Sequence, residues 1–137
     1  MLPLLYLNYD FFSAEIHKDF IISSIKEGVI LSEEKLNKIF ELFDIYYHNT
    51  KFVSIAHREF DYTVDPNLLR SKKHPNLKGI AVVCTSDSSR NIAEFERKFY
   101  PGHYEIFDTL EASITWAKKI LEKENSNISP GKLIKLI

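Results

Sequence analysis

Alternating apolar and polar positions near the N-terminus predict a β-hairpin. The two alternating segments are Phe11–His17 and Phe20–Lys26, and the polar pair Lys18-Asp19 separates them. The preceding segment, Leu4–Asp10, either extends the first strand or caps the sheet. Further along the chain, three short apolar runs are typical of buried strands. These runs are Phe52–Ala56, Ile80–Cys84 and Tyr104–Phe107.

Between these strands, apolar residues recur at helical spacing, and local signals mark where helices begin. The first helix is predicted to start after Ser32, a natural N-cap, and to bury one broad face. That face consists of Leu36, Ile39, Phe40, Phe43 and Tyr47. A second, short helix is predicted to begin at Asp65-Pro66, an N-cap followed by proline at the first helical position. It must stop before Pro75.

Two more helices are predicted in the C-terminal half of the chain. One runs from Asp87 to about Tyr100. Its predicted buried side consists of Ile92, Phe95 and Phe99. The other begins after Asp108, which together with Glu111 resembles a capping box. The apolar face of this last helix comprises Leu110, Ile114, Ala117 and Leu121.

The predicted order, β-β-α-β-α-β-α-β-α, places the chain in the α/β class. Strands that alternate with helices need crossover connections, so we expect a mixed, mostly parallel sheet with the N-terminal hairpin as an antiparallel pair at one edge. A single domain is expected over residues 1–124. Residues 125–137 are expected to form a polar linker and a short tail that ends in Leu133–Ile137.

Several short motifs follow one another in an order that is similar to a known superfamily. They are Glu27-Gly28, Phe52–Ala56 with His57-Arg58, Tyr62–Pro66, Gly79–Val83, Ala93-Glu94-x-Glu96-x-x-Phe99 and Phe107. With this order and spacing, residues 11–123 resemble the STAS superfamily, whose founding members are bacterial anti-sigma-factor antagonists (SpoIIAA-like). More narrowly, the chain resembles small SpoIIAA-like or STAS/SEC14-type proteins of Bacteroidetes.

The resemblance implies a STAS architecture and a small non-enzymatic module that binds a protein or a small ligand. In the antagonists, a partner kinase phosphorylates a serine at the start of the helix after the third strand, and the phosphate abolishes binding. Here that helix begins at Asp65-Pro66, and the nearest hydroxyls belong to Tyr62 and Thr63. The antagonists' Asp-Ser-Gly type signature is absent. The similar Asp87-Ser88-Ser89 follows the fourth predicted strand, Ile80–Cys84, rather than the third, Phe52–Ala56.

The composition argues against several classes of protein. The 137 residues carry 18 basic and 19 acidic side chains, a formal net charge of -1, which argues against a dedicated nucleic-acid binder. No apolar run approaches the roughly 20 residues that span a bilayer, and the N-terminal residues lack the features of a signal peptide. The single cysteine, Cys84, excludes an intramolecular disulfide framework. We therefore expect a cytoplasmic domain without a membrane span.

The first candidate site is the polar loop His57–Asp65. It follows a predicted central strand at its carboxyl end, where open α/β sheets place their ligand crevices. The residues expected to contact a partner or ligand are Arg58, Tyr62, Thr63 and Asp65. The alternative is a helix-entry loop in which Asp65 caps the helix and Arg58 pairs with a nearby carboxylate.

A second candidate site lies in the hydroxyl-rich segment Thr85–Arg90. Its candidate residues are Ser86, Asp87 and Ser88. The segment lacks the glycines that let a backbone approach a phosphate, so an ordinary N-cap is the alternative. The five histidines are scattered along the chain, and no nucleophile motif is present. No metal site, cofactor or catalytic residue is therefore predicted.

These observations predict a non-enzymatic intracellular regulatory module with a protein partner. A homodimer is among the expected states, because the tail Leu133–Ile137 is suited to dock on a neighbouring subunit. The first alternative is a SEC14-like carrier of a small apolar ligand such as a lipid. The second is an enzyme that uses carboxylates and His57. A filled core would favour the interaction module, a large apolar cavity the carrier, and a polar cleft with perturbed titratable groups the enzyme.

Overall fold

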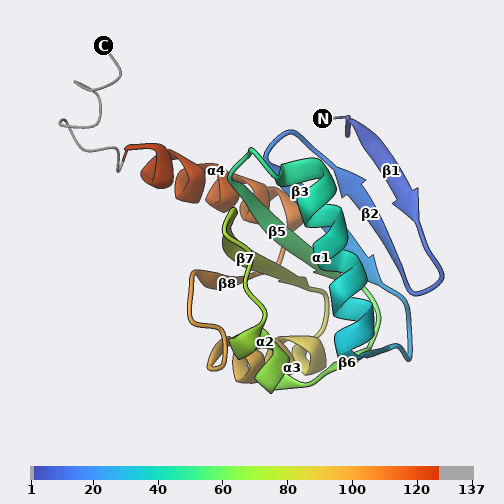
Figure 1. The fold of residues 1–137 in the computed structure, drawn as a ribbon. Helices are drawn as coiled ribbons and strands as arrows, with labels where there is room; N and C mark the ends of the chain where they lie inside the picture. Colours follow the sequence, from blue (N-terminus) through green and yellow to red (C-terminus); the bar gives the residue numbers. More distant parts are fainter. Residues whose placement is uncertain (1, 127–137) are drawn as a thin grey trace, which may run out of the picture.

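Within residues 2–126, which the computed structural model describes, six strands form one mixed sheet. In spatial order they are β1 (Leu5–Asn8), β2 (Phe12–Ile16), β3 (Phe20–Ile25), β5 (Phe52–Arg58), β7 (Leu77–Cys84) and β8 (Tyr104–Phe107) (Figure 1). The first three strands pair antiparallel with one another. The pairings β3–β5, β5–β7 and β7–β8 are parallel. The predicted α/β class, mixed sheet and N-terminal hairpin are therefore confirmed.

The described residues also hold three short strands that the sequence did not predict. The segment Leu4–Asp10 contributes β1, a separate edge strand that pairs with β2, so it neither extends the first hairpin strand nor caps the sheet. The strands β4 (Ile30–Leu31) and β6 (Thr63–Val64) pair in parallel as a small second sheet. Strands of two residues carry no alternation pattern, and this pairing joins positions far apart in sequence. Hydrophobic periodicity therefore gives no signal for them.

Four helices lie between and after these strands. They are α1 (Glu33–Tyr47), α2 (Pro66–Ser71), α3 (Asp87–Arg97) and α4 (Leu110–Ser126). The first two begin at the predicted caps: Ser32 accepts a hydrogen bond from the Lys35 amide, and Asp65 accepts one from the Asn67 amide. The last helix extends through residues 125 and 126 of the predicted linker, while the rest of the predicted linker and the tail, residues 127–137, lie outside the described residues. None of the four helices has the length and apolar character needed to cross a membrane.

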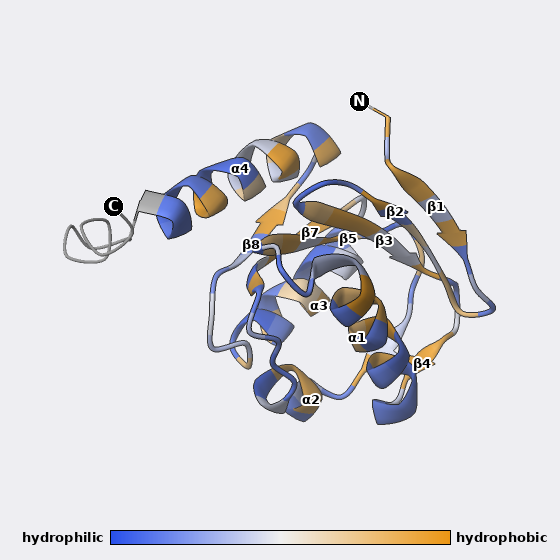
Figure 2. Cartoon of the chain, turned by 45° about the horizontal axis from the view of Figure 1, so that its top comes forward, coloured by the Kyte–Doolittle hydropathy of each residue, from blue (hydrophilic) through white to orange (hydrophobic). Residues whose placement is uncertain are grey.

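The helices cover the two faces of the sheet unequally. Figure 2 shows α4 on one face and the other three helices on the opposite face. Under α4, Ala117 and Leu121 pack against the sheet residues Val53, Ile55 and Val83.

On the other face, α1 ends at Tyr47, whose hydroxyl lies 2.8 Å from the carbonyl oxygens of both His17 and Phe20. The Tyr47 ring also stacks on Phe52, with 4.3 Å between the ring centroids. These contacts fix the C-terminal end of α1 against β3 and β5.

The buried side of α3 differs from the predicted one. Ile92 and Phe95 are 39% and 53% exposed. The residues that α3 buries are Ser89, Ala93 and Glu96, two of which are small. Small side chains let the helix approach β7 and β8 closely, and Glu96 meets a charged partner inside the fold. Packing at this sheet edge therefore overrides the apolar periodicity.

Candidate functional site

A cavity of about 120 Å³ lies between the sheet and the three helices α1, α2 and α3. The sheet lines it with small side chains on adjacent strands, Ser23 of β3 and Ser54 and Ala56 of β5. On the opposite side, the six-residue α2 lines it with Leu68 and Leu69 and has no fully buried residue. Small side chains on the sheet and a short helix above them therefore leave the space unfilled.

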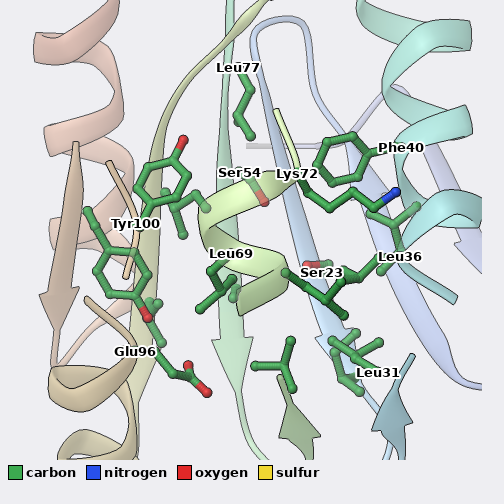
Figure 3. Close-up of a pocket in the computed structure, with 18 of the residues that line it drawn as sticks. Ser23, Leu31, Leu36, Phe40, Ser54, Leu69, Lys72, Leu77, Glu96 and Tyr100 are labelled. Carbon is green, nitrogen blue, oxygen red and sulfur yellow. The ribbon is translucent and has the colours of Figure 1, made fainter. Parts of the chain in front are cut away.

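The cavity has a polar end at Glu96 and a largely apolar end that also includes Lys72. Figure 3 shows Glu96 at one end, Leu36 and Phe40 at the other, and Ser54 and Leu69 between them. Five hydroxyl groups line it, those of Ser23, Ser54, Tyr62, Tyr100 and Tyr104. Within residues 2–126, none of these hydroxyls has a hydrogen-bonding partner. Because no buried side-chain nitrogen or oxygen of the described residues lacks a partner, these hydroxyls are reached by solvent, and a polar atom of a ligand would replace water on them.

Burial also affects the ionisation of these tyrosines. Desolvation raises the pKa of Tyr100 and of Tyr104 above the ordinary value for a phenol. It raises the pKa of Tyr62 to about 12, although the neighbouring Arg58 acts in the opposite direction. All three groups are consequently neutral hydroxyls at physiological pH, able both to donate and to accept a hydrogen bond.

The polar end of the cavity is built around a buried ion pair. Arg58, at the end of β5, is 2% exposed, and Glu96 of α3 is 6% exposed. The two guanidinium nitrogens Nη1 and Nη2 donate to the two carboxylate oxygens at 3.0 and 3.1 Å. The Tyr62 ring lies 4.2 Å from the guanidinium carbon of Arg58. This bidentate, stacked geometry fixes both Glu96 and Tyr62, which line the cavity.

The same contacts determine the charge of Arg58. Burial by itself lowers the pKa of the guanidinium, but the interactions with Tyr62 and Glu96 outweigh it, and the net shift is upward. Arg58 is therefore a permanent cation that positions its neighbours, and it does not itself line the cavity.

The structure divides the first set of predicted site residues into two groups. Arg58 and Tyr62 come together at the polar end of the cavity. Thr63 is exposed on β6, where its amide donates to the Val29 carbonyl, and Asp65 is exposed as the cap of α2. The loop therefore combines the two predicted alternatives: Asp65 caps a helix and Arg58 pairs with a carboxylate, while Tyr62 contributes to the cavity wall.

The second set of predicted residues lies at the end of the neighbouring strand β7. Ser86 caps α3 and accepts a hydrogen bond from the Ser89 amide at 3.1 Å. Asp87 and Ser88 are exposed in the first helical turn. Ser86 and Asp87 line an open polar depression of about 400 Å³, and Ser88 is not one of its lining residues. An ion pair between Arg90 and Asp108 crosses it, so its main cation is already paired.

Glu96 lines the cavity, and the sequence analysis did not single it out as a candidate site residue. Its partner Arg58 lies 38 positions earlier in the chain, so no local motif connects them. A usable signal is the spacing of Ser89, Ala93 and Glu96 at i, i+4 and i+7, which puts a carboxylate on the same helix face as two small residues.

His57, the histidine of the enzyme alternative, lies outside the cavity. His57 precedes Arg58 on β5, so its side chain projects to the opposite face of the sheet, where Nδ1 lies 3.4 Å from a Glu59 carboxylate oxygen. Among residues 2–126, no group of three or more histidine, cysteine, aspartate or glutamate side chains is placed to hold a metal ion. The chemistry that the cavity offers is hydrogen bonding and apolar contact.

The raised pKa of Tyr62 gives a pH-dependent prediction. In the wild type, one component of the tyrosinate absorbance at 295 nm should appear near pH 12, and the Tyr62→Phe variant should lack it. Because the folded-state pKa lies above that of the unfolded chain, the stability that the neutral phenol contributes is present below pH 10. It is lost as the pH rises through 12. Loss of a component that titrates near pH 10 in the variant would contradict the buried placement of this phenol.

No protein-family model, curated protein or solved structure matches this chain.

Proposed function

We propose that the chain is a non-enzymatic regulatory module of STAS-like architecture that works in the cytoplasm and binds a small molecule in the cavity between the sheet and α1–α3. The observation that carries the proposal is the combination of an apolar wall with five hydroxyls that lack partners within residues 2–126. Such a wall suits an uncharged molecule with an apolar body and a hydroxyl group. A charged ligand is disfavoured because Arg58 and Glu96 neutralise each other, and because Lys72, the other charged lining residue, contacts Asn37 and Glu33.

The size of the cavity limits the ligand. An engineered apolar cavity of about 150 Å³ binds benzene, whereas sites for drug-sized ligands measure about 300–1,000 Å³. A cavity of about 120 Å³ therefore suits a molecule close to a single six-membered ring. A long-chain lipid, as in the SEC14-like alternative, would need α2 to move away from the sheet.

The position of α2 suggests how a protein partner would distinguish the ligand-bound protein from the empty one. Leu69 and Tyr62 both line the cavity and both belong to the partly exposed segment that includes α2. A ligand that packs against these two side chains would stabilise α2 and order the surface around it. A partner that recognises this surface would then bind the loaded form in preference to the empty one.

A titration with phenol tests the proposal, because phenol combines an aromatic ring with one hydroxyl. We expect saturable chemical-shift changes, in methyl-labelled protein, at Leu69, Ile80 and Val82 of the cavity wall. In the Ala56→Leu variant the added side chain occupies the cavity, and the affinity for phenol should fall at least tenfold. The matched control is Ala112→Leu, since Ala112 is exposed on α4, and it should bind phenol as the wild type does.

Two results would refute this function. One is the absence of saturable shifts at the cavity methyl groups up to the solubility limit of phenol. The other is equal affinity in the Ala56→Leu and Ala112→Leu variants, which would place the phenol elsewhere on the molecule. Unfolding curves of both variants show whether they are folded during the titration.

A further inference from the structure

We propose that β1 is a dimerisation strand, which pairs antiparallel with β1 of a second copy of this chain and joins the two six-stranded sheets. β1 is the outermost strand of the sheet, so alternate residues direct their amide and carbonyl groups away from β2. No helix within residues 2–126 covers this edge, and Figure 2 shows β1 in orange for most of its length. The proposal does not depend on the ligand cavity, because no residue of β1 lines it.

β1 exposes side chains on both faces of the sheet, while Leu7 packs against the core. Leu5 and Tyr6 are 40% and 69% exposed, and adjacent residues of a strand point to opposite faces. Leu2, Leu4 and Tyr9, which flank the strand, are also exposed. A contiguous apolar segment of this kind at a sheet edge is typical of an interaction surface.

The opposite edge of the same sheet shows how an edge is normally protected. There, β8 carries Glu105, whose carboxylate lies 3.3 Å from Nη2 of Arg97. Charged side chains, proline and β-bulges on edge strands prevent pairing with other chains. β1 has none of these within Leu5–Asn8, and its register with β2 is continuous over all four residues. This edge is therefore open to pairing, while the β8 edge is protected by charge.

A second copy is the occupant that this edge fits best. A two-fold axis perpendicular to the sheet keeps each face continuous across the new pair of strands. If the axis passes through Tyr6, the two Tyr6 rings lie opposite each other, and each Leu5 lies beside Leu7 of the second copy. Aromatic and aliphatic cross-strand pairs of this kind stabilise antiparallel sheets.

Charge and area agree with self-association. No side chain in the segment 2–9 is charged, so two copies approach without repulsion. The exposed apolar residues of this segment have on the order of 600 Å² of accessible surface per copy, so a dimer that buries part of it stays below about 1,200 Å² in total, at the lower end of specific interfaces. The expected dimer is therefore reversible and depends on concentration.

Sedimentation velocity over a range of protein concentrations tests the proposal with two matched lysine variants. Tyr6→Lys puts a charge on β1, whereas Ile45→Lys puts one on α1 at a position of similar exposure, 62%. We expect the wild type and Ile45→Lys to shift from monomer to dimer as concentration rises. Tyr6→Lys should remain monomeric at least tenfold above the wild-type dissociation constant, with an unchanged circular dichroism spectrum.

A cysteine variant tests the geometry. Strand positions that face each other across a two-fold axis lie within the Cα separation that a disulfide spans. Under mild oxidation, Tyr6→Cys should form a covalent dimer, while Ile45→Cys and the wild type, whose Cys84 is buried, should not. A wild type that stays monomeric at millimolar concentration would overturn the proposal, and so would a dimer that tolerates Tyr6→Lys. A monomer that captures a strand from another protein would likewise exclude the second copy.

Discussion

Replacing Glu96 with leucine should lower the free energy of unfolding by about 3–5 kcal/mol, measured by urea denaturation. Leucine is close to glutamate in size, so little packing is lost. The guanidinium of Arg58, however, stays buried at the end of β5 without the carboxylate that satisfies two of its donors. Leaving a buried charge unpaired is the main cost.

The double variant Arg58→Met/Glu96→Leu separates this explanation from a simple packing defect. With both charges removed, apolar side chains occupy the same space, and stability should return to within about 1–2 kcal/mol of the wild type. The control is Glu94→Ala, because Glu94 forms an exposed pair with Arg97 on the same helix and should cost less than about 1 kcal/mol. Equal losses in the single and double variants would show that Arg58 is not left unpaired in the single variant.

Replacing Phe52 with alanine should also lower the free energy of unfolding by about 3–5 kcal/mol. Phe52 is fully buried at the start of β5, and its ring contacts three others. The ring centroids of Tyr47, Phe43 and His74 lie 4.3, 4.9 and 5.7 Å away. Removing the ring opens a cavity where α1 meets the sheet, and the surrounding rings cannot all move to fill it.

The matched control for Phe52 is Phe95→Ala on α3. Sequence periodicity predicts that Phe95 is buried, but the structure leaves it more than half exposed, so this substitution should cost less than about 1 kcal/mol. Urea denaturation of the two variants therefore compares the same chemical change in two environments. Comparable losses would mean that Phe95 packs inside the folded protein, as the sequence pattern predicts.

The features that sequence reasoning predicted well depend on neighbouring residues. Ser32 and the pair Asp65-Pro66 start helices because a side-chain oxygen reaches an amide two or three positions ahead. The buried strands Phe52–Ala56 and Ile80–Cys84 stood out because they carry long apolar runs between polar segments. These contacts are local or depend on composition, so a single sequence shows them.

The features that escaped prediction depend on distant partners. Arg58 was identified as a candidate, but its partner Glu96 was named only within the family motif, and the buried side of α3 was assigned to Ile92, Phe95 and Phe99. The cavity could not be predicted either, since it arises from the combined small volumes of side chains on separate strands and the shortness of α2. The hydrophobic periodicity of a single strand or helix does not show how much space its side chains leave next to those of other elements.

Under the proposed function, the unfilled space under α2 links the stability of the fold to the supply of the ligand. At about 24 cal/mol per Å³ of enclosed cavity, a partly open space of about 120 Å³ corresponds to at most roughly 3 kcal/mol of packing energy. A domain is commonly stable by only about 5–15 kcal/mol, so this is a large share. A ligand that fills the space restores those contacts and raises the folded fraction by mass action. In a cell, where unfolded chains are degraded, the abundance of the protein would then rise and fall with its ligand.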